Sequence, residues 1–438
     1  MGDLLMMGSL RLLRPSFLAL LLVSVASASL AADSQSKVEP PTGLWTGSIQ
    51  GRVGEVNFGV ELKPEGKGLS AMLLNATDRQ PFSSATWDGQ VLTFRLDYYD
   101  GQLTLHFVAP KKMEGEYSRQ TKGAGVHIPV TLVPYQEPAT GKAWTGPSLA
   151  GDWLLSEAGA EGAEKVVLTT FQQEKSASAD GKVAVTGILE PVSGDDGLMH
   201  GSMWTDANGH AHFHLSRFDG IHVLALIGEF QPDGSLKGEI GGVRASAPFT
   251  AERSRDAAVA NPNALAGSLT KMKDPAEPFR FSGVDAAGKT LNQSSPEFKG
   301  KPVIVDIFGT WCPNCHDEAP VLEELYRKYH PQGLEIVGLA YEYTDETARD
   351  LRQIGIYRSK YSLTFPLLLA GTTDEGQIQK TLPQLVHFGA FPTTIFLDRD
   401  GRVHAIHAGF EGPSTGEKYR EVQQRVDQLT REIVGVSH

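Results

Sequence analysis

The stretch Phe308-Gly-Thr-Trp-Cys-Pro-Asn-Cys-His316 decides the fold of the last third of this 438-residue chain. An apolar run, Pro302-Val-Ile-Val-Asp-Ile-Phe308, leads into it and predicts a buried strand. Residues 318–330, which follow it, carry apolar side chains at helical spacing. The only two cysteines of the chain, Cys312 and Cys315, therefore stand where a strand ends and a helix begins.

This position favours an ionised thiol. The positive end of the helix dipole and the unpaired backbone N–H groups at a helix start stabilise a thiolate, so Cys312 is predicted to be the exposed nucleophile. Cys315 lies three residues on, on the same side of the first turn, close enough to form a disulfide with it. Pro313 fits the first helical position, where its missing N–H costs nothing. The arrangement predicts thiol–disulfide exchange through a mixed disulfide.

Strands and helices alternate throughout the segment that contains the cysteines. Further strands are predicted at residues 334–340, 365–369, 393–397 and 403–407, and further helices at 345–356 and 417–434. Such alternation is typical of a sheet that is covered on both faces. Residues 278–438 are therefore predicted to form one α/β domain.

This α/β segment resembles the thioredoxin superfamily, specifically its exported TlpA/ResA-like branch of thiol–disulfide oxidoreductases. The resemblance covers residues 278–437 and rests on Gly300-Lys-Pro-Val303, the Trp-Cys-x-x-Cys segment, Ala390-Phe-Pro-Thr-Thr394 and Asp398-Arg-Asp-Gly401. It implies a thioredoxin-like fold in which Pro392 is a cis-proline whose loop packs against the cysteine pair and aligns an incoming disulfide-bearing chain. Trp311 would shield the thiols and offer a flat docking surface, although an aromatic ring beside a loop also serves ordinary packing.

Two acidic residues stand near the cysteine pair. By resemblance, Glu318 matches the acid that tunes the thiol pKa in TlpA/ResA-like proteins, and Asp306 matches the buried acid of thioredoxin, where many TlpA-like chains carry a neutral residue. The presence of both acids departs from either pattern. It leaves open which of the two accepts the Cys315 proton. A carboxylate under a strand end is desolvated, and its raised pKa suits proton relay. The alternative for each acid is a solvated or salt-bridged carboxylate.

Other uses of the cysteine pair fit the sequence less well than exchange. Cys312-x-x-Cys-His316 also fits c-type haem attachment, but the preceding buried strand, Trp311 and the match at Pro392 oppose it. A zinc site needs four ligands, and no second cysteine pair exists. A peroxidase needs a threonine–proline framework around a lone cysteine, whereas Gly309 stands three residues before Cys312. A purely structural pair is the remaining alternative, and no cofactor or metal is predicted.

Residues 41–252 have a different sequence pattern, in which short runs of alternating apolar and polar residues are broken by Gly, Asp and Asn. Val91-Leu-Thr-Phe-Arg-Leu96 and Phe213-His-Leu-Ser-Arg-Phe218 are each followed by an Asp-Gly pair, at residues 100–101 and 219–220, which predicts two-residue hairpin turns. Trp45 precedes the first of these two segments and Trp153 precedes the second, so the repeated features occur in the same order. A duplicated antiparallel all-β unit is therefore predicted, at residues 42–134 and 150–252. Each copy would be a small barrel or a sandwich, or the two would share one core.

The segments around the β-rich copies carry weaker signals. Residues 135–149 are predicted to be a short connector and residues 253–277 a polar linker. In the second copy, His210, His212 and His214 alternate on one face of a predicted strand. A two-residue turn at 219–220 would set Arg217 opposite His222, placing His222 on the other face. A polar outer face is the prediction for these histidines.

The N-terminus has the pattern of a secretory signal. Arg11 and Arg14 precede Phe17-Leu-Ala-Leu-Leu-Leu-Val23, and Ser29-Leu-Ala31 resembles a cleavage site, so residues 1–31 are predicted to be a signal peptide. An uncleaved anchor is the alternative, because residues 16–32 nearly reach spanning length. The formal net charge of −12 argues against a general nucleic-acid binder, and 40% hydrophobic residues exclude full disorder.

These observations predict an exported thiol–disulfide oxidoreductase of the periplasm or cell envelope. By resemblance it is a reductase that serves cytochrome c maturation or a similar task. Its predicted partners are a disulfide-bearing exported protein as substrate and a membrane thiol transporter as electron donor. A second hypothesis from another class is that the β-rich region binds a ligand or an envelope partner, with the thioredoxin-like part as an accessory.

Overall fold

The computed structural model describes residues 39–435, apart from residues 67, 122, 159–163, 192–195, 255–269 and 375. These residues belong to one compact unit. The predicted signal peptide, residues 1–31, lies outside the described residues. No helix within the described ranges is long and apolar enough to cross a bilayer.

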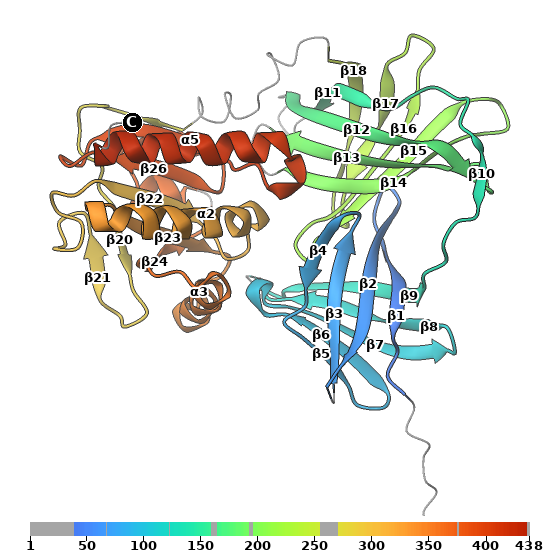
Figure 1. Cartoon of the computed structure of the whole chain (residues 1–438), viewed down its shortest axis with the longest axis horizontal. Coiled ribbons are helices and arrows are strands. Elements are labelled where there is room, and N and C mark those ends of the chain that lie inside the picture. Colours follow the sequence, from blue (N-terminus) through green and yellow to red (C-terminus); the bar gives the residue numbers. More distant parts are fainter. Residues whose placement is uncertain are drawn as a thin grey trace, which may run out of the picture. The chain divides into compact units, whose positions relative to one another are not determined.

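The first β-rich unit is a closed antiparallel sheet, coloured blue to cyan in Figure 1. Eight strands form the ring in the order β2-β1-β9-β8-β7-β6-β5-β3, and pairing of β3 with β2 closes it, while β4 extends from β3. The strands are β1 (Gly43–Gln50), β2 (Glu55–Glu65), β3 (Gly68–Asn75), β4 (Asp78–Pro81), β5 (Ser84–Trp87), β6 (Val91–Leu96), β7 (Gly101–Ala109), β8 (Lys112–Arg119) and β9 (Val126–Pro134).

The second unit repeats this plan. Its ring runs β12-β11-β18-β17-β16-β15-β14-β13, and pairing of β13 with β12 closes it. The strands are β11 (Gly151–Ala158), β12 (Glu164–Ser178), β13 (Val183–Pro191), β14 (Gly197–Thr205), β15 (Ala211–Phe218), β16 (Val223–Phe230), β17 (Leu236–Gly241) and β18 (Ser246–Arg253). Trp45 in β1 and Trp153 in β11 occupy equivalent places in the two rings, so the duplication is visible in the strand order itself.

Each ring has its own core of inward-pointing side chains. In β6, Leu92, Phe94 and Leu96 alternate with more exposed residues and are fully buried, as period-two patterning dictates. The two cores meet at Phe218 of β15, whose ring lies 4.7 Å from that of Phe58 in β2. The two copies therefore keep separate cores and pack against each other through β2 and β15.

The predicted two-residue turns are wrong in both copies. In the first, Leu96 pairs with Gly101, and a 3-10 turn (Asp97–Tyr99) followed by Asp100 connects the strands. In the second, Phe218 pairs with Val223, so His222 lies in the turn rather than on a strand face. There Asp219 Oδ1 accepts the N–H groups of residues 221 and 222, an Asx-type turn that outcompetes the tighter hairpin.

Both segments predicted as connections contain strand residues. β10 (Thr140–Ala143) pairs with β12 and so extends the second ring. β19 (Lys271–Met272) pairs with β25 (Leu385–Val386), which fixes the end of the predicted linker onto the last domain. Here backbone pairing overrides the polar composition on which the prediction rested.

The C-terminal domain is a seven-stranded mixed sheet with helices. The strand order is β21-β20-β24-β23-β22-β26-β27. The strands are β20 (Ser282–Val284), β21 (Thr290–Asn292), β22 (Val303–Phe308), β23 (Glu335–Glu342), β24 (Leu367–Thr372), β26 (Thr393–Leu397) and β27 (Val403–Ala408). The helices are α2 (Pro313–Tyr329), α3 (Thr347–Tyr361), α4 (Gln377–Thr381) and α5 (Glu417–Val434), with 3-10 turns at His330–Gln332 and Pro413–Thr415.

Side chains of the central strand β22 alternate between two cores. Ile304 and Phe308 pack with α2, α3 and α5, whereas Val305 and Ile307 pack against the segment around Phe279 and α4. Helices α2 and α5 lie in contact over one face of this sheet (Figure 1). The prediction of a duplicated antiparallel β region followed by a thioredoxin-like α/β domain is confirmed.

Candidate active site

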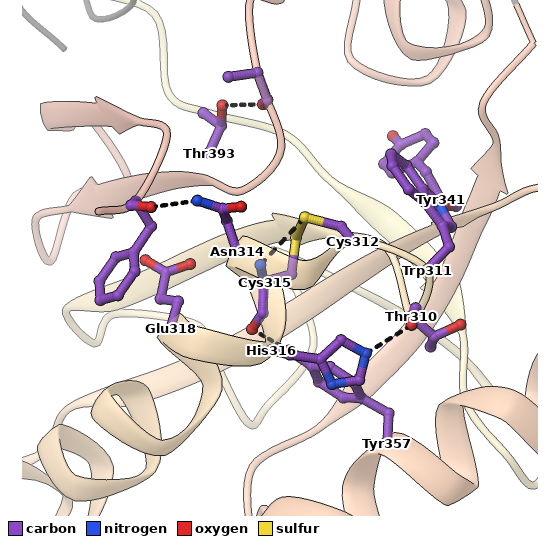
Figure 2. The surroundings of a disulfide bond; sticks show 12 residues. Thr310, Trp311, Cys312, Asn314, Cys315, His316, Glu318, Tyr341, Tyr357 and Thr393 are labelled. Carbon is purple, nitrogen blue, oxygen red and sulfur yellow. Dashed lines mark hydrogen bonds between the residues drawn. A yellow bond between two sulfur atoms is a disulfide. The ribbon is translucent and has the colours of Figure 1, made fainter. Parts of the chain in front are cut away.

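The cysteine pair lies at the junction of β22 and α2. Cys312 is the N-cap residue of α2, and its Sγ accepts a hydrogen bond of 3.1 Å from the Cys315 N–H (Figure 2). Pro313 occupies the first helical turn. The two cysteines form a disulfide with their Cα atoms 5.3 Å apart. When the pair is reduced, the same N–H stabilises a Cys312 thiolate.

Cys312 is less exposed in this disulfide form than the sequence predicted. It is 4% exposed and Cys315 is 1% exposed, because both pack into the core that α2 shares with β22. Burial protects the disulfide from solvent.

Aromatic and proline side chains surround the cysteine loop. Trp311 stacks on Tyr343 with ring centroids 4.5 Å apart and meets Phe391 edge-on at 5.1 Å. Its indole N–H donates to the carbonyl of Tyr341 at 2.8 Å. The Phe391–Pro392 peptide bond is cis, and Thr393 pairs with Ile307 at the end of β22. The proline loop therefore lies beside the strand end from which the cysteine loop departs.

His316 has no nitrogen available for a ligand. Its Nε2 lies 2.8 Å from the Thr310 carbonyl and its Nδ1 2.8 Å from the Tyr361 hydroxyl. A carbonyl only accepts, so Nε2 carries the proton and Nδ1 accepts from Tyr361. Burial lowers the pKa of His316 well below its usual value, and Lys360 adds to that effect. This geometry opposes haem attachment, and no three metal-ligating side chains converge in the described ranges.

The two acids of the sequence prediction are both buried, Asp306 in β22 and Glu318 in α2, the two elements that flank the cysteine loop. Asp306 pairs across the sheet with Thr394, whose hydroxyl donates to Glu318 Oε1 at 2.6 Å. The other Glu318 oxygen and one Asp306 oxygen have no hydrogen-bond partner. Burial raises the pKa of both carboxyl groups, and repulsion from Glu318 raises the pKa of Asp306 further. The solvated or salt-bridged alternative does not describe either residue.

A third buried acid, Glu342, was not predicted from the sequence. It ends β23, and its two oxygens accept the Thr310 N–H at 3.0 Å and the Thr310 hydroxyl at 2.8 Å. Arg349 lies 3.5 Å from it and also pairs with Asp100 of the first β-rich unit at 3.0 Å. Burial raises the pKa of Glu342 to about 7, while Thr310 and Arg349 act in the opposite direction. An acid at the end of an apolar strand, beside the strand that carries the cysteines, was the available signal.

Replacing Glu342 with alanine is expected to lower the free energy of unfolding by about 2–4 kcal/mol. The change leaves the buried Thr310 groups without an acceptor and removes one partner of Arg349. Urea unfolding followed by far-UV circular dichroism measures the difference. The matched control is Glu346→Ala, an exposed acid just before α3. Equal midpoints for the two variants would show that Glu342 does not hold the loop before Cys312.

Comparison with known proteins identifies the C-terminal domain. The Redoxin family model matches residues 271–422. The thiol-disulfide oxidoreductase ResA of Bacillus thuringiensis subsp. konkukian is 31% identical over 156 residues, which cover 36% of this chain and 80% of that protein. The thioredoxin-like protein YneN of Bacillus subtilis is 29% identical over 146 residues, which cover 33% of this chain and 75% of YneN.

Solved structures are similar to about the same share of the chain. A thiol:disulfide interchange protein of Chlorobium tepidum is 24% identical, with a TM-score of 0.28, and covers 36% of this chain and 98% of its own. StoA of Bacillus subtilis is 18% identical, with a TM-score of 0.26, and covers 36% of this chain and 99% of its own. Because 80% of the ResA relative is matched at 31% identity, the chain belongs, through its C-terminal third, to the ResA-like thiol–disulfide oxidoreductases of the Redoxin family.

Proposed function

We propose that this protein is an exported thiol–disulfide oxidoreductase that reduces disulfides of other exported proteins. Its membership in the ResA-like oxidoreductases and its Cys312–Cys315 pair give the exchange chemistry. The single observation that carries the proposal is the N-cap position of Cys312, where its sulfur accepts the Cys315 N–H. The N-terminal signal pattern of residues 1–31 supports export.

The reaction begins with the Cys312 thiolate attacking one sulfur of a substrate disulfide. That S–S bond breaks, the first substrate thiolate leaves, and a mixed disulfide forms. Cys315 then gives its proton to the Asp306–Glu318 pair and attacks the Cys312 sulfur, which releases the second substrate thiolate. The substrate gains two electrons, and the protein is left with the Cys312–Cys315 disulfide. A membrane thiol transporter restores the dithiol by the reverse sequence.

The other residues of the predicted site have supporting roles in this proposal. Trp311 and the loop of Pro392 form the surface on which the substrate chain docks beside Cys312. Residues 278–438 carry the exchange reaction, and the two β-rich units, residues 42–134 and 150–252, help to select the substrate. Cytochrome c maturation is the task that the ResA-like resemblance favours for a reductase of this kind.

The redox equilibrium of the cysteine pair tests the proposal. We expect a reversible two-electron transition nearer about −250 mV than about −120 mV, read from Trp311 fluorescence in thiol–disulfide buffers. In a Trp311→Phe variant, any remaining fluorescence change comes from the other tryptophans. Thiol labelling of that variant measures the redox state of the cysteine pair independently of fluorescence. A value near about −120 mV would point to an oxidant or isomerase. Absence of any reversible transition would remove the exchange function altogether.

A further inference from the structure

A pocket of about 410 Å³ lies beside the start of α2. Pro313 and Asn314, the two residues between the cysteines, form part of its wall. Asp317 and the end of α3 continue that wall, and both β-rich units complete it through the β3–β4 turn and the ends of β14 and β15. We call this the acidic pocket, after its carboxylates Asp78, Asp196, Asp219 and Asp317. Its volume is that of a small-ligand site.

The acidic pocket has four carboxylates and three cationic side chains, of which Arg79 pairs with Glu61, outside the pocket lining. Arg217 is paired with Asp219, with its nitrogens 2.6–2.7 Å from that carboxylate. Lys360, at the exposed rim, has its ammonium 3.5 Å from the ring centre of Tyr98. Among the described residues, no lysine or arginine nitrogen lies within 4.0 Å of the carboxylates of Asp78, Asp196 or Asp317. Within that part of the chain, three acidic groups therefore lack an ion-pair partner.

Two of these carboxylates, Asp196 and Asp317, lie beside Gly412, which precedes the lining residue Pro413. Asn314 and the Gly412 N–H donate to the two oxygens of Asp196, the latter at 3.2 Å. A Cβ built on Gly412 would press on Asp317 Oδ2 while lying 3.9 Å from Asp196 Oδ2. Burial raises the pKa of Asp317 to about 7, and the charge of Asp78 contributes, while Arg217 and Lys360 act in the opposite direction. A cation bound in the acidic pocket would lower the repulsion among its carboxylates.

A separate observation at the pocket wall also indicates a missing donor. Asn75 is only 5% exposed, and its Nδ2 donates to the Leu198 carbonyl at 2.6 Å. Its Oδ1 accepts no hydrogen bond, although Asn75 lines the acidic pocket. An unsatisfied buried acceptor costs free energy that a bound N–H donor recovers.

We propose that the acidic pocket binds a lysine or arginine side chain of the disulfide-bearing polypeptide. This inference rests on the proposed exchange function and specifies its substrate class. Since Pro313 and Asn314 form one wall, the basic residue lies within a few positions of the substrate cysteine, because an extended chain spans at most about 3.3–3.6 Å per residue. The β-rich units then contribute directly to substrate choice, because they supply Asp78 and Asp196.

The test compares two disulfide-cyclised peptides in reactions with the full reduced protein. The peptides differ only in carrying lysine or glutamine beside the cysteine that is attacked. We expect kcat/KM to be about tenfold higher for the lysine peptide, as a charge-assisted hydrogen bond provides. The preference should shrink at 1 M salt, where the screening length is about 3 Å.

Asp317→Asn and Asp78→Asn are expected to remove most of the preference, measured within each variant as the ratio of kcat/KM for the lysine peptide to kcat/KM for the glutamine peptide. Asp78 is exposed, so its variant separates binding from folding, and Asp400→Asn, an exposed acid outside the acidic pocket, is the matched control. Equal rates for both peptides with the unaltered protein, or an unchanged preference in both pocket variants, would overturn the inference. Failure to reduce either peptide would instead overturn the exchange function, so the two failures are distinguishable.

Discussion

Replacing Cys315 with serine is expected to stop turnover and to leave Cys312 in a stable mixed disulfide with its substrate. The N-cap position keeps the Cys312 thiolate nucleophilic, so the first step survives. The second step fails because no thiol remains 5.3 Å away, Cα to Cα, to attack the mixed disulfide. Catalytic turnover should fall by about 10³-fold or more, since the two cysteines act as a unit.

This prediction is tested by detecting the trapped complex and by comparing it with a variant of the other cysteine. Non-reducing electrophoresis and mass spectrometry of the Cys315→Ser protein should reveal a covalent adduct with a disulfide-bearing peptide. Cys312→Ser is the matched control, because it removes the nucleophile and should form far less adduct. Equal adduct yields from the two variants would contradict the assignment of Cys312 as the attacking residue. An unchanged turnover in either variant would contradict the two-cysteine cycle.

The sequence was sufficient to predict the thioredoxin-like domain, because its signals are local. Apolar runs and helical spacing around Cys312 predicted β22 and α2, and α5 (Glu417–Val434) was predicted with its observed bounds. The duplicated β region was also predictable from repeated strands and turns. That each copy closes into a ring was not, since closure depends on pairing between strands that are distant in sequence, such as β1 with β9.

The hairpin turns show why local rules failed. An Asp-Gly pair favours a two-residue turn in isolation, but Tyr98 and Tyr99 in the first turn are buried against partners outside it. The Tyr99 ring meets that of His316 in α2 at 4.9 Å. Burial of two aromatic side chains stabilises the longer turn by more than the ideal hairpin geometry could. A pair of tyrosines in a supposed hairpin turn was the sequence signal of this contact.

Glu342 and the acidic pocket were missed for a related reason. Each depends on segments more than 30 residues apart that meet only in the folded chain, as the bond from Thr310 to Glu342 does. The cysteine site itself was predictable because its nucleophile, resolving thiol and helix start lie within four residues. Tertiary structure adds the surroundings of that site, to which the proposals above assign proton transfer and substrate choice.

Substituting the buried acids Asp306 and Glu318 is expected to lower activity but to raise stability at high pH. Asp306→Asn and Glu318→Gln should each slow reduction of the mixed disulfide, and the double variant should slow it by about 10²-fold, because Cys315 loses its proton acceptor. An acceptor must be ionised, so the rate for the unaltered protein should rise with pH as the pKa of Glu318, which burial raises to about 7, is passed. Burial and repulsion from Glu318 raise the pKa of Asp306 as well. The double variant should lack that rise in rate.

Stability should change in the other direction. The folded-state pKa of each acid is raised, so the folded form of the oxidised protein binds more protons than the unfolded form at intermediate pH. Its free energy of unfolding is therefore greatest at low pH and falls as pH rises from the unfolded-state pKa to the folded-state pKa, by about 1.4 kcal/mol per acid for each pH unit between the two. Asp306→Asn removes part of this fall, so the variant should be the more stable protein at pH 8 and about equal near pH 4.

Glu324→Gln is the matched control, since Glu324 lies on the same helix as Glu318 but is exposed. It should leave both the pH–rate profile and the pH dependence of urea unfolding unchanged. A slower but equally pH-dependent reaction in the double variant would mean that another group takes the Cys315 proton. Loss of activity together with loss of stability at pH 8 would mean that the acids are structural. If the two buried carboxylates serve proton transfer, the same substitution should both slow the reaction and raise the stability of the protein at pH 8.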